Sequence, residues 1–188
     1  PPPEQALGFR SRDPEEVRRS LREVPITAAL VPEVMRLLAW DDVARDAIEA
    51  LRRAGAEAIE PLTAGLLDPQ EEFAVRRRIP LVLATETDSR SVEALAQGLA
   101  DRRFEVRYRC GRGLSHLADL NPSLKLAPSV AQEAILREVG VGAGVWEGPR
   151  LLDPLDDEPW SPVVDDLVRE RADKSLEHVF TLLAFLLP

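Results

Sequence analysis

The sequence predicts an all-α protein, specifically a right-handed α-solenoid of stacked antiparallel helix pairs. Three observations support this prediction: a composition poor in aromatic residues, an internal repeat, and turn residues between the repeated segments. Hydrophobic residues make up 45% of the 188 residues, charged residues 30% and aromatic residues 5%, which is typical of a soluble helical protein. A chain of this length can bury an ordinary core, or stack a few repeats, without disulfides or metals.

The internal repeat is clearest in the middle of the chain. Residues 59–68 recur as residues 92–101, an offset of 33, with apolar positions at helical spacing. In the segment that follows, residues 75–79 match residues 106–110, an offset of 31. The loop of the second copy is therefore shorter, and loops tolerate such changes in length. A weaker first copy places Val43 at the position that begins the second helix in the other copies.

Each copy is expected to hold two amphipathic helices joined by a short turn that carries an aspartate. A single helix pair cannot bury its apolar stripe alone, so the copies should stack and share one elongated core. Pro80 lies inside a helical pattern and should bend or end its helix. We expect a linker and leading helix over residues 1–25 and a single repeat domain over residues 26–188. Within this domain we expect three copies, at residues 26–54, 56–86 and 89–120. A degenerate fourth copy is expected at residues 128–188, with an irregular insertion at residues 140–162.

Two copies, EPLTAGLLDPQEEFAVRRRIPLVLA and EALAQGLADRRFEVRYRCGRGLSHLA, resemble HEAT repeats in their Leu-rich first helix, turn aspartate and Val-Arg start of the second helix. The resemblance covers residues 31–118, and the short period fits shorter bacterial HEAT-like repeats. In such arrays the turn aspartate pairs with an arginine of its own or the next repeat. The resemblance therefore implies a structural ladder that joins Asp68 with Arg76 and Asp101 with Arg107.

The C-terminal segment SLEHVFTLLAFLLP resembles segments of bacterial proteins in which HEAT-like repeats follow a membrane half related to nucleotide translocases. This resemblance implies an alternative function, that of a regulatory cytosolic domain of a membrane transporter. The uncharged part of the segment is shorter than the roughly 20 residues that a membrane helix needs. We therefore expect no membrane insertion of this segment, even if the parent protein is membrane-attached.

Arginines cluster in the middle copies, where the second helices of a solenoid line its concave face. A basic groove of this kind suits a partner that bears carboxylates or phosphates. The alternative is a solvated charged face without a partner. Tryptophans at turns or in the insertion serve either as binding anchors or as lids on the core. The candidate partner-binding residues are Arg77, Arg78, Arg102, Arg103, Arg109, Arg112, Trp146 and Trp160.

The sequence holds no convincing catalytic, cofactor or metal motif. One cysteine and two histidines make a metal centre improbable, and Cys110 matches Ile79, which favours a small buried residue over a nucleophile. The glycines of residues 140–144 are not followed by the Lys-Ser/Thr of a phosphate loop. We therefore expect no cofactor and no metal.

The leading hypothesis is a non-catalytic cytoplasmic scaffold that binds a protein partner, or other domains of its own chain, through its concave face. The net charge of −9 argues against nucleic acid as a partner, since phosphate binding draws on an excess of Lys and Arg. Some HEAT-like proteins are DNA glycosylases and others are bilin lyases. An enzyme of either type is the less favoured alternative, because no matching motif is present.

Overall fold

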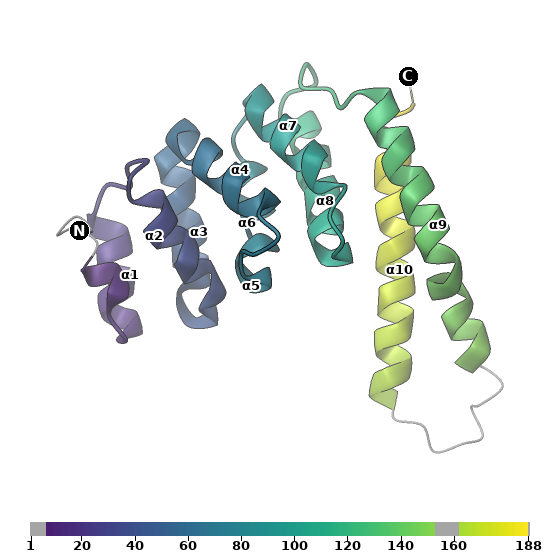
Figure 1. Cartoon of the computed structure of the whole chain (residues 1–188), viewed down its shortest axis with the longest axis horizontal. Coiled ribbons are helices and arrows are strands. Elements are labelled where there is room, and N and C mark those ends of the chain that lie inside the picture. The colour runs from purple at the N-terminus through teal and green to yellow at the C-terminus, as the bar shows by residue number, and fades with distance from the viewer. Residues whose placement is uncertain (1–6, 153–161, 188) are drawn as a thin grey trace. The chain divides into compact units, whose positions relative to one another are not determined.

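The computed structural model describes residues 7–152 and 162–187. Every regular element among these residues is a helix, and the chain divides into two compact units between Leu124 and Lys125 (Figure 1). The first unit contains η2 (Gly8–Arg10), α1 (Pro14–Glu23), α2 (Val31–Arg36), η3 (Leu37–Ala39), α3 (Asp41–Ala54), η4 (Gly55–Ala58), α4 (Ile59–Leu67), α5 (Phe73–Arg76), α6 (Ile79–Leu83), α7 (Ser89–Gly98) and α8 (Phe104–Leu120). The second unit contains α9 (Pro128–Leu152) and α10 (Pro162–Ala184).

Two rows of helices run through the first unit. Along one row α2 contacts α4 and α4 contacts α7, and along the other α3 contacts α6 and α6 contacts α8 (Figure 1). Contacts of α2 with α3, α4 with α6 and α7 with α8 join the rows, and α1 packs against α3. The apolar residues at helical spacing form the core, with Leu38, Leu51, Leu62, Leu66, Ile79, Leu83, Leu95 and Leu117 fully buried.

Short polar side chains and one glycine set several helix ends. The Asp13 carboxylate accepts a hydrogen bond from the Glu15 N–H, and Asp88 accepts one from the Arg90 N–H, so each caps the helix that follows. Gly55 ends α3 with a φ of 61°, in the left-handed region that glycine enters without a steric cost.

The second helix of the middle copy is divided by Pro80. Helix α5 ends at Arg76, and α6 begins at Ile79 with Pro80 in its first turn. Proline lacks an N–H, and its ring would clash with the carbonyl four residues earlier, so one continuous helix is disfavoured here. The expectation that Pro80 interrupts its helix is confirmed. As a result, Arg77 and Arg78 lie between two short helices.

Matching glycines in α4 and α7 allow other elements to approach closely. Gly65 and Gly98 occupy equivalent positions at the repeat offset of 33. A Cβ at Gly65 would lie 2.7 Å from the Met35 sulfur and 3.3 Å from Ile79 Cδ1, and a Cβ at Gly98 would overlap Cys110 Sγ. Ile79 and Cys110 are themselves matched at the offset of 31, so the two copies share a packing contact. Cys110 is buried, as its alignment with Ile79 predicts.

The second unit is a hairpin in which α9 and α10 pack along each other (Figure 1). The sequence predicted an irregular insertion over residues 140–162, but residues 140–152 continue α9 to Leu152. Residues 153–161 lie outside the described residues. The prediction rested on the glycines of this segment, because each helical glycine costs about 1 kcal/mol relative to alanine. In the structure this cost does not prevent residues 140–152 from being helical. At Gly142 the missing side chain has a packing role, since a Cβ would lie 2.7 Å from the Trp146 indole.

Candidate interaction surface

Arg76 joins the second and third helix pairs through a buried ion pair. Its guanidinium donates to the Asp101 carboxylate, and each side chain is 9% exposed. The same guanidinium donates to the Leu66 carbonyl, from Nε at 3.0 Å and from Nη2 at 2.9 Å. Leu66 lies in the last turn of α4, where carbonyls lack a partner within the helix. Arg76 therefore satisfies this carbonyl and places its positive charge at the negative end of the helix dipole.

The two turn aspartates of the expected ladder differ in their partners. Asp68 accepts a hydrogen bond from the Gln70 N–H at 2.8 Å, and Asp101 accepts the equivalent bond from the Arg103 N–H at 2.7 Å. Each aspartate thus holds its own turn. Arg76 pairs with Asp101 of the following copy, whereas the expected pair was Arg76 with Asp68 of the same copy. The connection therefore runs between copies, from the turn aspartate to an arginine of the preceding copy, whereas the resemblance implied an arginine of the same or the next copy.

Arg107 occupies the position that matches Arg76 and is also buried. It donates to the carbonyl of Asp101 at 2.9 Å and to that of Arg102 at 3.1 Å. The predicted partners Arg107 and Asp101 are thus in contact, through the backbone carbonyl of Asp101. This hydrogen bond stabilises the turn between α7 and α8. Arg112 lies further along α8 and is exposed.

Two of the predicted partner-binding arginines are engaged within the first unit. Arg78 donates to the Leu38 carbonyl and to the Asp41 carboxylate, and this hydrogen bond lowers the pKa of Asp41. The pair connects the second copy with the turn of the first. Arg109 Nε lies 2.9 Å from Glu105 Oε1 one helical turn away, an arrangement that supports the helix surface.

Two other predicted arginines, Arg77 and Arg103, lie beside an exposed aromatic ring. Phe73 is 37% exposed, and its ring centroid lies 5.1 Å from Cζ of Arg103 and 5.9 Å from Cζ of Arg77, within the range of cation–π contacts. Arg102 follows the α7 turn beside Arg103, and both are exposed. Within the described parts of the chain, Arg77, Arg102 and Arg103 form no ion pair. We call Phe73, Arg77, Arg102 and Arg103 the Phe73 cluster.

Phe73 is not among the residues predicted from the sequence, although the repeat carries a signal for it. Phe73 and Phe104 match at the offset of 31, and each stands two residues before the repeated valine of its copy. The Phe104 ring packs on Tyr108 with centroids 5.7 Å apart, and the Arg107 guanidinium lies 5.7 Å from its centroid. An aromatic residue that recurs beside arginines is the pattern that cation–π contacts require.

The predicted tryptophan anchors do not belong to this cluster. Trp146 is on α9 in the second unit, partly buried, with its indole against Gly142. Trp160 lies outside the described residues. In the first unit, Phe73 is an exposed aromatic side chain that lies beside two of the predicted arginines.

Two further reactive side chains, Cys110 and His178, are buried. Burial raises the pKa of the Cys110 thiol, which keeps it protonated and shielded. In the second unit, His178 Nε2 lies 3.8 Å from Glu138 Oε1, with the two side chains 1% and 2% exposed. Across residues 7–152 and 162–187, no group of three or more His, Cys, Asp or Glu side chains is arranged to hold a metal ion.

No family model matches the sequence, and no curated protein matches it. Among the helices that the structure describes, none is both long and apolar enough to cross a membrane.

Proposed function

We propose that the protein is a non-catalytic scaffold built on a short right-handed α-solenoid, and that it binds a carboxylate-bearing segment of a protein partner, or of its own chain, at the Phe73 cluster. The observation that carries this proposal is the exposed Phe73 ring flanked by the guanidiniums of Arg77 and Arg103. The two-row order of helix contacts and the repeated glycine contact support the solenoid arrangement.

The cluster combines the two features that a small binding surface needs. Arginine presents a planar set of donors that matches a carboxylate, and a guanidinium held over an aromatic ring loses less freedom when it binds. Phe73 adds apolar area between these charges. Aromatic and arginine side chains are the residues that most often dominate binding energy in protein interfaces.

The surroundings of the cluster favour a local contact over delocalised charge attraction. The protein has a net charge of −9, so an acidic partner is repelled at a distance and attracted close to the cluster. At physiological ionic strength the repulsion is largely screened beyond about 8 Å. Binding is therefore expected to weaken with salt and to require the apolar contact with Phe73.

The test uses the whole protein and a fluorescent peptide of glutamates around one phenylalanine, followed by fluorescence anisotropy. The double variant Arg102→Glu/Arg103→Glu reverses two exposed charges of the cluster and should weaken binding about tenfold or more, at up to about 1 kcal/mol per exposed pair plus new repulsion. Arg12→Glu/Arg19→Glu makes the same change in net charge at exposed arginines of the first unit outside the cluster and should leave binding almost unchanged.

Phe73→Ala separates the apolar contribution from charge, and it should weaken the phenylalanine-containing peptide more than a phenylalanine-free glutamate peptide, which loses only the ordering of Arg77 and Arg103 by the ring. Equal losses in the two charge-reversed variants would show binding by net charge alone. That outcome, or no saturable binding, would overturn the proposal.

A further inference from the structure

We infer that one face of the α9–α10 hairpin is a self-association surface, on which a second copy of this chain packs to form a four-helix bundle. Five large apolar side chains define this face, and each is at least 37% exposed: Leu136, Val139, Leu176, Phe180 and Leu183. We call them the Leu136 face. They belong to the second unit, so the inference does not depend on the Phe73 cluster or on the proposed function.

The antiparallel course of α9 and α10 brings residues from both helices to the same level (Figure 1). His178 Nε2 lies 3.8 Å from Glu138 Oε1, which fixes the level of these two residues. Leu136 stands two residues before Glu138, and Phe180 stands two residues after His178. Leu136 and Phe180 are therefore level with each other, and they are the most exposed members of the face, at 74% and 68%.

Helical periodicity places the two helices' exposed apolar residues on the same side of the hairpin. Val139 directly follows the buried Glu138, and Leu183 directly follows the buried Leu182. Each residue turns about 100° around its helix, so Val139 and Leu183 are turned by equal angles from the buried direction. Because the helices are antiparallel, equal turns in the direction of the chain lead to the same side of the pair.

The other members of the face continue these two stripes. Leu136 stands three residues before Val139 on α9. On α10, Phe180 stands three residues before Leu183, and Leu176 stands four residues before Phe180. Residues three and four apart are neighbours on one side of a helix. The five side chains therefore form one continuous apolar surface that extends across both helices.

The exposed area of the Leu136 face matches what a stable homodimer needs. At about 200 Å² for each large apolar side chain, the exposed fractions correspond to about 500 Å² per copy. A standard interface buries about 800 Å² per partner, and about 65% of a homodimer interface is apolar, which again gives about 500 Å². One further hairpin is therefore sufficient to cover the face.

The chemistry of the face favours a second copy over a different protein. The next positions of the α9 stripe are Gln132 and Ala143, so this stripe carries no charge from residue 132 to residue 143. Charged groups across an interface usually give specificity for one partner, and this surface offers none. Two hairpins related by a two-fold axis present the same apolar surface to each other. Together they close the packed core of a four-helix bundle, which two helices alone cannot enclose.

The acidity of the chain gives this association a distinctive salt dependence. Each copy has a net charge of −9, so two copies repel each other and added salt screens the repulsion. The apolar contact itself does not draw on charge. Self-association should therefore strengthen with salt, whereas binding of an acidic peptide at the Phe73 cluster should weaken.

The experiment is sedimentation velocity of the whole protein from about 1 to about 100 μM, at physiological ionic strength and at about 0.5 M salt. A shift from monomer to dimer is expected within this range, at lower protein concentration in high salt. Leu136→Lys/Phe180→Lys should weaken the dimer about a hundredfold or more, because charges then replace central apolar contacts. Both side chains are exposed, so the helix content by circular dichroism should not change.

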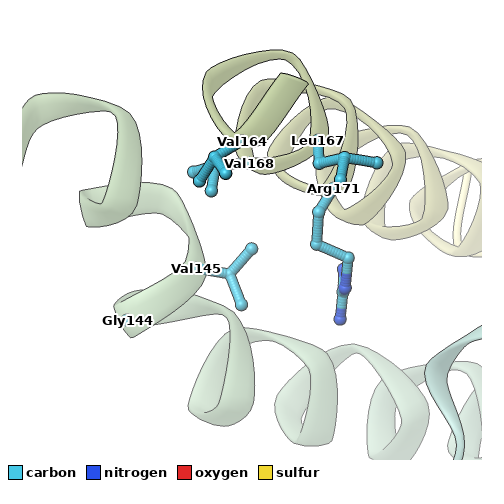
Figure 2. Close-up of a pocket in the computed structure, with 6 residues that line it drawn as sticks. All are labelled: Gly144, Val145, Val164, Leu167, Val168 and Arg171. Atoms are coloured by element: carbon cyan, nitrogen blue, oxygen red, sulfur yellow. The ribbon is translucent and has the colours of Figure 1, made fainter. Parts of the chain in front are cut away.

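Val141→Lys/Leu167→Lys is the matched control. Val141 on α9 and Leu167 on α10 are 55% and 57% exposed, and each is turned about 60° from the buried direction in the opposite sense. Leu167 lines a pocket with Val145 on that other side (Figure 2). The two double variants change the net charge equally. The control should therefore dimerise like the unmodified protein.

Three results would overturn the inference. A monomer at every concentration would mean that another part of the chain or a different protein covers the face. Equal loss in the two double variants would place the contact elsewhere, and a dimer that weakens in high salt would be held by charge. Phe73→Ala should dimerise like the unmodified protein, which keeps the outcomes for the two surfaces distinct.

Discussion

The buried ion pair between Arg76 and Asp101 should make Asp101 far more important to stability than Asp68, although the two aspartates occupy matching turns. Asp101→Ala removes the turn bond to the Arg103 N–H and leaves the Arg76 guanidinium without its carboxylate. Asp68→Ala removes only the equivalent turn bond, to the Gln70 N–H. The comparison therefore isolates the ion pair from the turn.

The magnitudes follow from burial. Loss of a capping bond of this kind costs about 1 kcal/mol. Removing one partner of a buried pair costs about 3–5 kcal/mol, and the lower end applies here because Arg76 keeps its two hydrogen bonds to the Leu66 carbonyl. We expect Asp101→Ala to lower the free energy of unfolding by about 3–4 kcal/mol and Asp68→Ala by about 1 kcal/mol.

The assay is urea unfolding followed by circular dichroism, at equal pH and salt for all variants. Adding Arg76→Met to Asp101→Ala should recover part of the loss, since apolar replacement of both members of a buried pair is often neutral. Equal destabilisation by Asp101→Ala and Asp68→Ala would refute the reasoning, because it would mean that the pair adds nothing beyond the turn.

Three further predictions concern packing, protonation and reactivity. Gly98→Ala should lower the free energy of unfolding by about 1–3 kcal/mol through overlap with Cys110 Sγ, and adding Cys110→Ala should restore it in the same urea assay. The hydrogen bond from Arg10 lowers the pKa of Glu33 from its ordinary value of 4.5, so this pair adds a small stabilisation above that pH and loses it as the pH falls through the lowered pKa. Glu33→Gln should flatten this part of the pH–stability curve, and an unchanged curve would contradict the assignment. Burial raises the pKa of Cys110, so iodoacetamide at pH 8 should label it in urea and not in the native protein, as measured by mass spectrometry.

Much of the fold follows from local sequence signals. The repeated apolar spacing predicts the helices of residues 31–120, because each stripe must be covered by a neighbouring helix. Pro80 predicts the break between α5 and α6, since its ring and missing N–H act on the helix locally. The offset that pairs Cys110 with Ile79 predicts a buried thiol. In each case a short segment holds all the information that the prediction needs.

The errors arise where packing over distance decides the structure. The glycines of residues 140–144 favour irregular structure locally, yet they lie within α9, where the Trp146 indole covers Gly142. The partner of Asp101 is likewise set by how the copies stack, and no spacing within one copy shows that Arg76 reaches the next turn. Phe73 was missed because its role depends on Arg103, which is in the following copy.

The adjacent residues Arg76 and Arg77 show how a repeat separates buried from exposed arginines. Val75 is buried, and each further residue turns about 100° around the helix. The position after the valine therefore points along the interface between copies, where Arg76 and Arg107 are both buried. The next position turns away from the core, and it holds Arg45, Arg77 and Tyr108 in the three copies, all at least partly exposed.

The number of arginines in a copy therefore overstates how many are accessible to a partner. In the second and third copies one arginine, Arg76 or Arg107, is buried between helices. The same logic predicts opposite phenotypes for neighbouring alanine substitutions. Arg76→Ala should lower stability with little direct effect on the Phe73 cluster, since Arg76 faces Asp101 and Leu66. Arg77→Ala should weaken binding of the acidic peptide more than it lowers stability, since Arg77 contacts the exposed Phe73 ring. If the two variants instead lost stability and binding in the same proportion, position in the repeat would not determine the role of an arginine.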